Sequence, residues 1–335
     1  PEPVRVFPDF RFTYMSGSEN AYTLDRAQVS YGGGVFDDVM PVAQIRDLTL
    51  RRRFAGEMRL RFSFEAKTGG LPVSLACEPM RYNGIWINGT AVSLSENWWL
   101  DRSFRTADIG ALVHRGTNTI EMSFEYYQRQ AVYDVLYGNA TESLRNCLHF
   151  DTEIEAVYLF GDFGVSTAAD QYTPADHGSL CYTGDFTLTR RPDTVSLTNV
   201  VREGFPFFAG KISLCGKVIL PGPVGAEFRR VWLHFKGRYA YADFTINGKA
   251  AERLFFRKYC DVTKLVRPGE NTVTVTMCNS ARNLLGPHHD TQCEPLVVAP
   301  GNFTLEKCWT EAGCEAYRPS YSFMPFGGTL YFEVE

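Results

Sequence analysis

The sequence predicts an all-β protein made of two antiparallel β-sandwiches in tandem, and three observations support this prediction. Apolar and polar residues alternate with a period of two in many short runs, which places one side of each strand in a core and the other in water. Gly, Pro and Asn separate these runs, and no run sustains the 3.6-residue period of a helix. The length of 335 residues suits two domains at ~150 residues each.

The alternating runs occur in both halves of the chain. Residues 58–65 and 120–125 alternate in the first half, and residues 231–236, 272–277 and 329–334 alternate in the second. Short amphipathic strands with turn residues between them favour antiparallel sheets and exclude a TIM barrel. Helix is therefore expected only in short turns.

An internal repeat indicates that both halves of the chain contain the same succession of strands and turns. Trp-Ile-Asn-Gly at 86–89 and Thr-Ile-Asn-Gly at 245–248 each precede an Asp that is followed by a Leu and a Gly-x-Asn-Thr segment, at 108–120 and 261–273. Asn and Gly accept the two positive φ angles of a type I′ hairpin turn, so a hairpin is predicted to turn at each Asn-Gly pair. The Asp carboxylate caps a short helical turn, and Gly-x-Asn reverses the chain into the next strand.

The segment between the two copies gives a domain boundary. Small and polar residues gather at 166–189, so we expect a first domain at 1–165 and a second at 166–335. Residues 160–165 are apolar enough to pack, which suggests that the two sandwiches abut.

Composition excludes several classes of protein. A net charge of −4 argues against a nucleic-acid partner, and no apolar run reaches the ~18 residues that span a bilayer. Nine cysteines, an odd number without a C-x-x-C motif, indicate neither a full disulfide framework nor a zinc site. Reduced thiols favour the bacterial cytoplasm or an anaerobic environment. The chain begins at Pro1 without an initiator Met, so we expect a processed product or part of a longer protein.

The repeat resembles a known family. Its pattern, an Asn-Gly turn, then Asp-ψ-Thr-x-Leu, then Gly-x-Asn-Thr-ψ, where ψ is apolar, is similar to the galactose-binding-like jelly roll. That jelly roll is the sugar-binding domain of family 2 glycoside hydrolases and of rhamnosidase-type enzymes. The second copy carries the pattern most completely, at 246–248 and 261–265, whereas Gly110 replaces the Thr in the first copy. The resemblance implies two tandem jelly-roll sandwiches, with a structural Ca²⁺ left open and no other cofactor.

The resemblance also implies a function. It points to a non-catalytic carbohydrate-binding region, the C-terminal accessory part of a bacterial glycoside hydrolase. Its partners would be an oligo- or polysaccharide and the catalytic domain of the same parent chain. Two alternatives stay open: a scaffold that braces the catalytic domain without binding sugar, and an all-β glycosidase with an unrecognised carboxylate pair. Glu153 and Glu155 resemble the solvated side of an ordinary strand, so no catalytic residue is assigned.

A sugar site combines aromatic rings, which stack on pyranose rings, with polar groups that bind hydroxyls. The first copy of the repeat has six extra residues between its Asn and its Asp, in a stretch that contains two adjacent Trp residues beside charged side chains. For each Trp the competing interpretation is a position in the core. For the adjacent residues His288 and His289 it is a loop that its own polar groups hold in place. The predicted sugar-binding residues are Trp98, Trp99, Asp101, Arg102, Trp232, Arg282, Asn283, His288 and His289.

Overall fold

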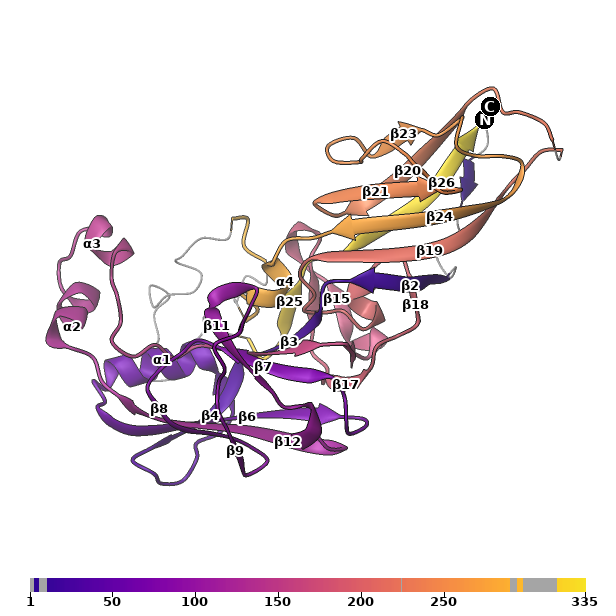
Figure 1. The fold of residues 1–335 in the computed structure, drawn as a ribbon. Coiled ribbons are helices and arrows are strands. Elements are labelled where there is room, and N and C mark those ends of the chain that lie inside the picture. Colours follow the sequence, from indigo (N-terminus) through magenta and orange to yellow (C-terminus); the bar gives the residue numbers. More distant parts are fainter. Residues whose placement is uncertain (1–2, 6–10, 224, 290–293, 298–317) are drawn as a thin grey trace.

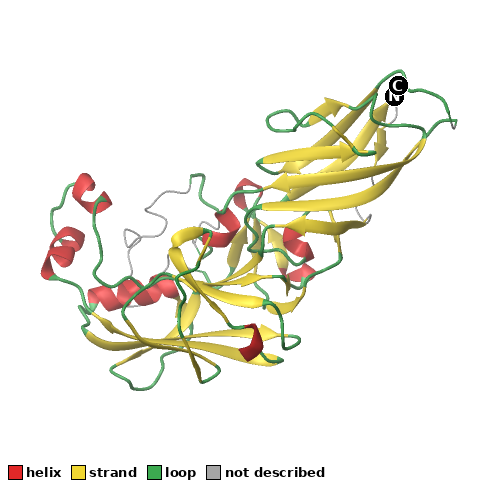
Figure 2. Cartoon of the chain, viewed as in Figure 1, coloured by secondary structure: helices red, strands yellow, loops and turns green. Residues whose placement is uncertain are grey.

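The computed structural model describes residues 3–5, 11–223, 225–289, 294–297 and 318–335. Antiparallel strands dominate these residues and form two lobes with a small third sheet between them (Figure 1; Figure 2). The predicted all-β sandwich class is therefore confirmed. Within the described ranges, no helix is both long and apolar enough to cross a bilayer.

The first lobe contains two sheets, whose inward side chains form its core. The larger sheet consists, in spatial order, of β14 (Phe163–Ser166), β17 (Thr187–Arg190), β6 (Gly56–Ala66), β12 (Gly116–Tyr126), β8 (Tyr82–Ile87) and β9 (Thr90–Val92). In addition, β4 (Arg26–Tyr31) pairs with β6, and β5 (Met40–Pro41) pairs with β4. The smaller sheet consists of β10 (Trp98–Trp99), β11 (Asp101–Asp108), β7 (Val73–Cys77), β13 (Val157–Gly161) and β3 (Asn20–Leu24).

The second lobe also contains two sheets, and a three-stranded sheet lies between the lobes (Figure 1). One sheet of the second lobe has the order β1 (Pro3–Arg5), β26 (Gly327–Val334), β20 (Val231–Arg238) and β23 (Tyr259–Asp261). The other has the order β18 (Thr194–Ser196), β2 (Arg11–Gly17), β19 (Lys211–Leu220), β24 (Gly269–Cys278), β21 (Tyr241–Ile246) and β22 (Lys249–Ala250). The small sheet consists of β15 (Tyr172–Pro174), β16 (Leu180–Tyr182) and β25 (Tyr321–Phe323).

Strand pairs cross the point at which the sequence predicts a domain boundary. β1 and β2 come from the start of the chain, yet β1 pairs with β26, and β2 lies between β18 and β19 in the second lobe. Conversely, β17 pairs with β14 and runs parallel to β6 in the first lobe. Each lobe thus holds strands from both sides of residue 165, and the division into 1–165 and 166–335 stays a prediction.

Both copies of the repeat contain the predicted hairpin turns. Asn88 and Gly89 have φ angles of 50° and 82°, and Asn247 and Gly248 have 51° and 82°. The flanking strands pair across these turns, β8 with β9 and β21 with β22. Two consecutive residues with positive φ define the type I′ turn, so this prediction is confirmed.

Helices are longer than the short turns that the sequence predicts. The helix α1 (Val42–Arg51) buries Val42, Ile45 and Leu50, which lie on one face at helical spacing, so a short 3.6-residue period was missed. The other α-helices are α2 (Gln130–Tyr137), α3 (Glu142–Asn146) and α4 (Arg282–Leu285). Short 3₁₀ turns occupy Gly110–Leu112, Ala169–Gln171, Asp176–Gly178 and Val200–Glu203.

The two lobes share one continuous core, in which buried side chains of both lobes belong to a single cluster. Aromatic rings connect the lobes at the small sheet: the ring centroid of Phe207 lies 5.0 Å from that of Phe186 and 5.1 Å from that of Phe323. The buried aromatic contacts hold the small sheet between the sandwiches, which agrees with the expectation that the sandwiches abut.

Candidate functional site

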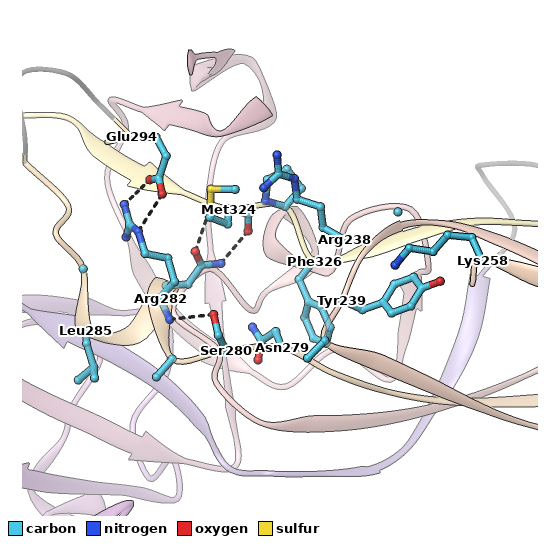
Figure 3. A pocket seen from close by; sticks show the side chains of 16 residues that line it. Arg238, Tyr239, Lys258, Asn279, Ser280, Arg282, Leu285, Glu294, Met324 and Phe326 are labelled. Carbon is cyan, nitrogen blue, oxygen red and sulfur yellow. Dashed lines mark hydrogen bonds and ion pairs between the residues drawn. The ribbon is translucent and has the colours of Figure 1, made fainter. Parts of the chain in front are cut away.

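A pocket of about 790 Å³ lies where α4 and the segment between β25 and β26 meet the turn from β20 to β21. Figure 3 shows the side chains that line it. The segments that form the pocket are far apart in sequence, at 237–240, 258, 279–286, 294 and 324–326. Two of the predicted sugar-binding residues, Arg282 and Asn283, are among its lining residues.

Arg282 forms a buried ion pair at one wall of the pocket. Its Nε donates to Glu294 at 3.2 Å, and a terminal nitrogen donates to the other Glu294 oxygen and to the carbonyl of Pro287 at 2.8 Å. The side chains of Arg282 and Glu294 are only 10% and 8% exposed. The Nη1 atom is buried and has no hydrogen-bond partner within the described ranges. The pair fixes the guanidinium and cancels its charge.

Asn283, the next residue of α4, also lines the pocket. Its amide nitrogen donates to the carbonyl of Met324 at 2.8 Å, and its carbonyl oxygen accepts from the backbone N–H of Met324 at 2.8 Å. The side chain is 2% exposed. Asn283 therefore joins α4 to the strand connection beside it, and both ends of its amide are occupied.

Lys258 supplies a second cation at the far side of the pocket. Its Nζ lies 3.7 Å from the ring centroid of Tyr239, whose hydroxyl donates to the carbonyl of Phe235 at 2.7 Å. Desolvation lowers the pKa of Lys258, and no carboxylate in the described part of the chain pairs with it. Arg238 also lines the pocket and donates to the carbonyl of His177.

The remaining wall is apolar. Leu285, Met324 and Pro325 line it, and Leu285 is 43% exposed. The hydroxyl of Ser280 accepts from the backbone N–H of Arg282 at 3.4 Å and keeps its own proton free to donate. The pocket thus offers an apolar surface beside fixed polar groups, which suits a ligand with an apolar face and several hydroxyls.

Sequence reasoning missed Arg238, Tyr239, Lys258 and Glu294 as lining residues. Each lies in a different segment from Arg282, and no local motif marks any of them. The one usable signal is chemical, because a buried Arg282 requires an acidic partner such as Glu294.

His288 and His289 lie in a buried cluster next to the pocket. Both are 5% exposed, and their Nδ1 atoms donate to the carbonyls of Ser322 at 3.1 Å and Ser320 at 2.9 Å. Burial lowers the pKa of His288 to about 4, so its ring is neutral near pH 7. Their sugar-binding role stays a prediction, while their contacts tie the segment after α4 to β25.

Asp25 completes this cluster from the first lobe. Its carboxylate lies 3.2 Å from Nε2 of His289 and accepts a 2.9 Å hydrogen bond from the hydroxyl of Tyr321. Burial raises the pKa of Asp25, but His289, His288 and Tyr321 outweigh this effect and lower it. The hydroxyl of Thr23 also donates to the carbonyl of Leu284 at 2.6 Å. These contacts attach the elements of the pocket to β3.

The adjacent Trp residues of the first lobe have different environments. Trp99 stacks on Phe160, with ring centroids 4.7 Å apart, and packs against the core. Trp98 is 54% exposed and belongs to the short strand β10. Asp101 and Arg102 follow on the exposed start of β11. Of these two rings, the one of Trp98 offers solvent the open aromatic surface.

Trp232 lies on the outward face of β20, as its alternation predicts. Its ring contacts Tyr259 at 5.6 Å between centroids, and Arg230 lies 5.0 Å from its centroid. Two residues further along β20, His234 stacks on Tyr331, with ring centroids 4.5 Å apart. Neither Trp232 nor the group around Trp98 lines the pocket at α4, so the structure brings only part of the predicted set together.

The described cysteines are free, and they are Cys77, Cys147, Cys181, Cys215, Cys260 and Cys278. Cys293, Cys308 and Cys314 lie outside the described residues. Within the described ranges, no group of three or more His, Cys, Asp or Glu side chains could hold a metal ion. A structural Ca²⁺ is therefore not assigned to any residues.

No protein-family model and no curated protein matches the sequence. Solved structures match at low identity. An α-L-rhamnosidase of Streptomyces avermitilis is 12% identical, with 80% of this chain and 25% of that one covered and a TM-score of 0.33. A rhamnosidase of Novosphingobium sp. PP1Y is 17% identical, with 83% and 22% covered and a TM-score of 0.27. A β-glucuronidase of Ruminococcus gnavus is 11% identical, with 82% and 44% covered and a TM-score of 0.31.

The chain spans less than half of the length of each of these structures. TM-scores of this size assign neither an activity nor a ligand to it.

Proposed function

We propose that this chain is a non-catalytic carbohydrate-binding region of a larger glycoside hydrolase. The observation that carries the proposal is the pocket at α4, where the apolar surface of Leu285, Met324 and Pro325 faces the donors of Ser280 and Lys258. Ligand sites of 300–1,000 Å³ with this combination are typical of small-molecule recognition. The repeated Asn-Gly turn, together with the Asp-ψ-Thr-x-Leu segment of the second copy, supports a sugar as the ligand and a glycoside hydrolase as the parent chain.

Isothermal titration calorimetry against a panel of neutral and acidic oligosaccharides tests this function. Lys258→Gln should weaken binding about tenfold, because it removes one charged donor from the pocket. Lys249→Gln is the matched control, since Lys249 is an exposed lysine of the same lobe, in β22. If the Lys258→Gln variant binds sugar as tightly as the wild type, the sugar site lies outside this pocket. Failure of every glycan to bind would refute the proposal and favour a scaffold without a sugar ligand.

One observation favours the alternative that the chain is itself a glycosidase. Glu155 lies in the segment before β13, not on the solvated side of a strand as predicted. Burial, Glu78 and Glu153 raise the pKa of Glu155 to about 7. A carboxyl group with a pKa raised towards neutral pH by burial and by other carboxylates resembles the general acid of a glycosidase. Release of reducing sugar by the wild-type chain but not by Glu155→Gln would establish this activity.

A further inference from the structure

A second pocket, of about 500 Å³, lies on the first lobe. Its floor includes Arg61, Ser63 and Glu65, which belong to the polar face of β6. The alternation of β6 predicts that this face is in water, but residues 183–187 and 319–321 line the same pocket. At this point Arg61 is half-buried, while Ser63 and Glu65 stay exposed on the pocket surface. This pocket and the one at α4 share no lining residue.

Arg26, at the start of β4, lines this pocket without a partner. No residue in the described part of the chain accepts a hydrogen bond from its guanidinium or forms an ion pair with it, and its Nε is closed to water. A buried donor without an acceptor is destabilising, so proteins rarely keep one without a reason. A ligand that accepts from this guanidinium would supply the missing partner.

Asp185 supplies an unpaired carboxylate in the same pocket. Its side chain is exposed, and no donor within the described ranges binds it. Burial and the carboxylates of Asp25 and Asp185 raise the pKa of Tyr22, whereas Arg26 lowers it, so both groups lie near this ring. Arg26 and Asp185 nevertheless form no ion pair with each other. The space between a free donor and a free acceptor can hold a ligand.

The other charged groups of the pocket are occupied. Nε of Arg61 donates to Glu121 at 2.9 Å, and its guanidinium lies 3.8 Å from the ring centroid of Phe36. Glu65 accepts from the hydroxyl of Thr117. Arg26 and Asp185 are thus the charged side chains of this pocket that remain available to a ligand.

We propose that this pocket binds a neutral sugar residue whose hydroxyl groups bridge Arg26 and Asp185. A guanidinium only donates hydrogen bonds and a carboxylate only accepts them, while a hydroxyl does both. The hydroxyls of Ser63, Thr183 and Thr187 line the same space. An anionic ligand would meet Asp185 and Glu65, and it would lose by repulsion much of what it gained from Arg26. Neutral polyols satisfy both free groups at once.

Saturation-transfer NMR and calorimetry with D-galactose, D-glucose and D-galacturonate test this site. The wild-type chain should bind at least one of the two neutral sugars more tightly than the acidic one. Arg26→Gln and Asp185→Asn should each weaken that binding about ten- to hundredfold, because each removes a charged hydrogen-bonding group. Arg59→Gln is the matched control, since Arg59 lies on the same face of β6 but pairs with Glu57 outside the pocket.

The thermal midpoint of the ligand-free variants separates binding from folding. The Arg26 side chain makes no hydrogen bond to the described residues, so Arg26→Gln should leave the midpoint unchanged or raise it. The inference is overturned if neither neutral sugar binds, if galacturonate binds as tightly as galactose, or if both variants bind like the wild type. If Lys258→Gln abolishes binding while Arg26→Gln does not, the site at α4 stands and this one fails; the reverse result has the opposite meaning.

Discussion

The side-chain amide nitrogen of Asn88 donates a 2.8 Å hydrogen bond to the side-chain oxygen of Asn118. Asn247 makes the same 2.8 Å bond to Asn271 in the second lobe. In each copy the first Asn also accepts from the backbone N–H that follows the second Asn. The repeated sequence pattern is therefore a repeated network that ties a hairpin turn to the strand after it.

Asn118 and Asn271 are the buried centres of these networks, with exposures of 0% and 1%. Asn118→Ala and Asn271→Ala should each lower the free energy of unfolding by ~2–4 kcal/mol, because several backbone groups lose their buried partner. Urea unfolding measures the change. Asn97→Ala, at an exposed position, is the control and should change stability by less than ~0.5 kcal/mol. Equal effects at the buried and exposed sites would contradict this interpretation.

Trp98 and Trp99 should respond differently to truncation. Trp99→Ala removes a ring that stacks on Phe160 and should destabilise the chain by ~2–4 kcal/mol, seen as a lower thermal midpoint. Trp98→Ala removes an exposed ring and should leave the midpoint nearly unchanged. If Trp98 takes part in sugar binding, calorimetry will show that Trp98→Ala binds sugar more weakly although the protein is fully folded. A stable Trp99→Ala variant would argue against the packing described.

The Arg282–Glu294 pair predicts a non-additive double-mutant cycle. Arg282→Met leaves the Glu294 carboxylate buried without a counter-charge and should cost ~3–5 kcal/mol. Adding Glu294→Gln removes that charge and should restore part of the loss. The exposed pair of Lys217 and Glu270 gives the comparison, because Lys217→Met should cost less than ~1 kcal/mol. Additive effects at Arg282 and Glu294 would show that the pair is not buried in solution.

The buried His288 should make the free energy of unfolding decrease as the pH falls. Burial lowers its pKa from 6.5 to about 4, so the unfolded chain binds the proton more readily than the folded one. The stabilisation is complete above pH ~6.5 and is lost as the pH falls towards 4, by up to about 3 kcal/mol. Urea unfolding at pH 7.5 and pH 5 should show a smaller difference for His288→Gln than for the wild type. His114→Gln, at an exposed position, should keep the wild-type difference.

The sequence predicts those parts of the fold that have local signals. Alternation marks the strands, and the Asn-Gly pairs mark both hairpin turns. The helix α1 was missed because Val42, Ile45 and Leu50 sustain a helical period over only three turns. The pairing of β2 with β19 has no local signal, because the two strands lie on either side of the whole first lobe in the sequence.

The candidate site was predictable only in part, for a related reason. Arg282 and Asn283 lie in a segment whose polar residues suggested binding, and they do line a pocket. Lys258 and Glu294 reach the same pocket from other segments through tertiary packing. Trp99 shows the opposite case, because polar and charged residues flank the short run 98–100 in which it lies, while its ring stacks in space on Phe160. Composition near a residue does not reveal which face of it a distant strand covers.

The position of β2 between β18 and β19 has a consequence for the order in which the chain folds. The strand is synthesised before both of its partners, which lie at 194–220. At ribosomal rates of 5–20 residues per second, β2 waits about ten to forty seconds for them. The first lobe is made during that interval, so an early strand must stay unpaired, and keep from pairing with other chains, until the second lobe forms around it.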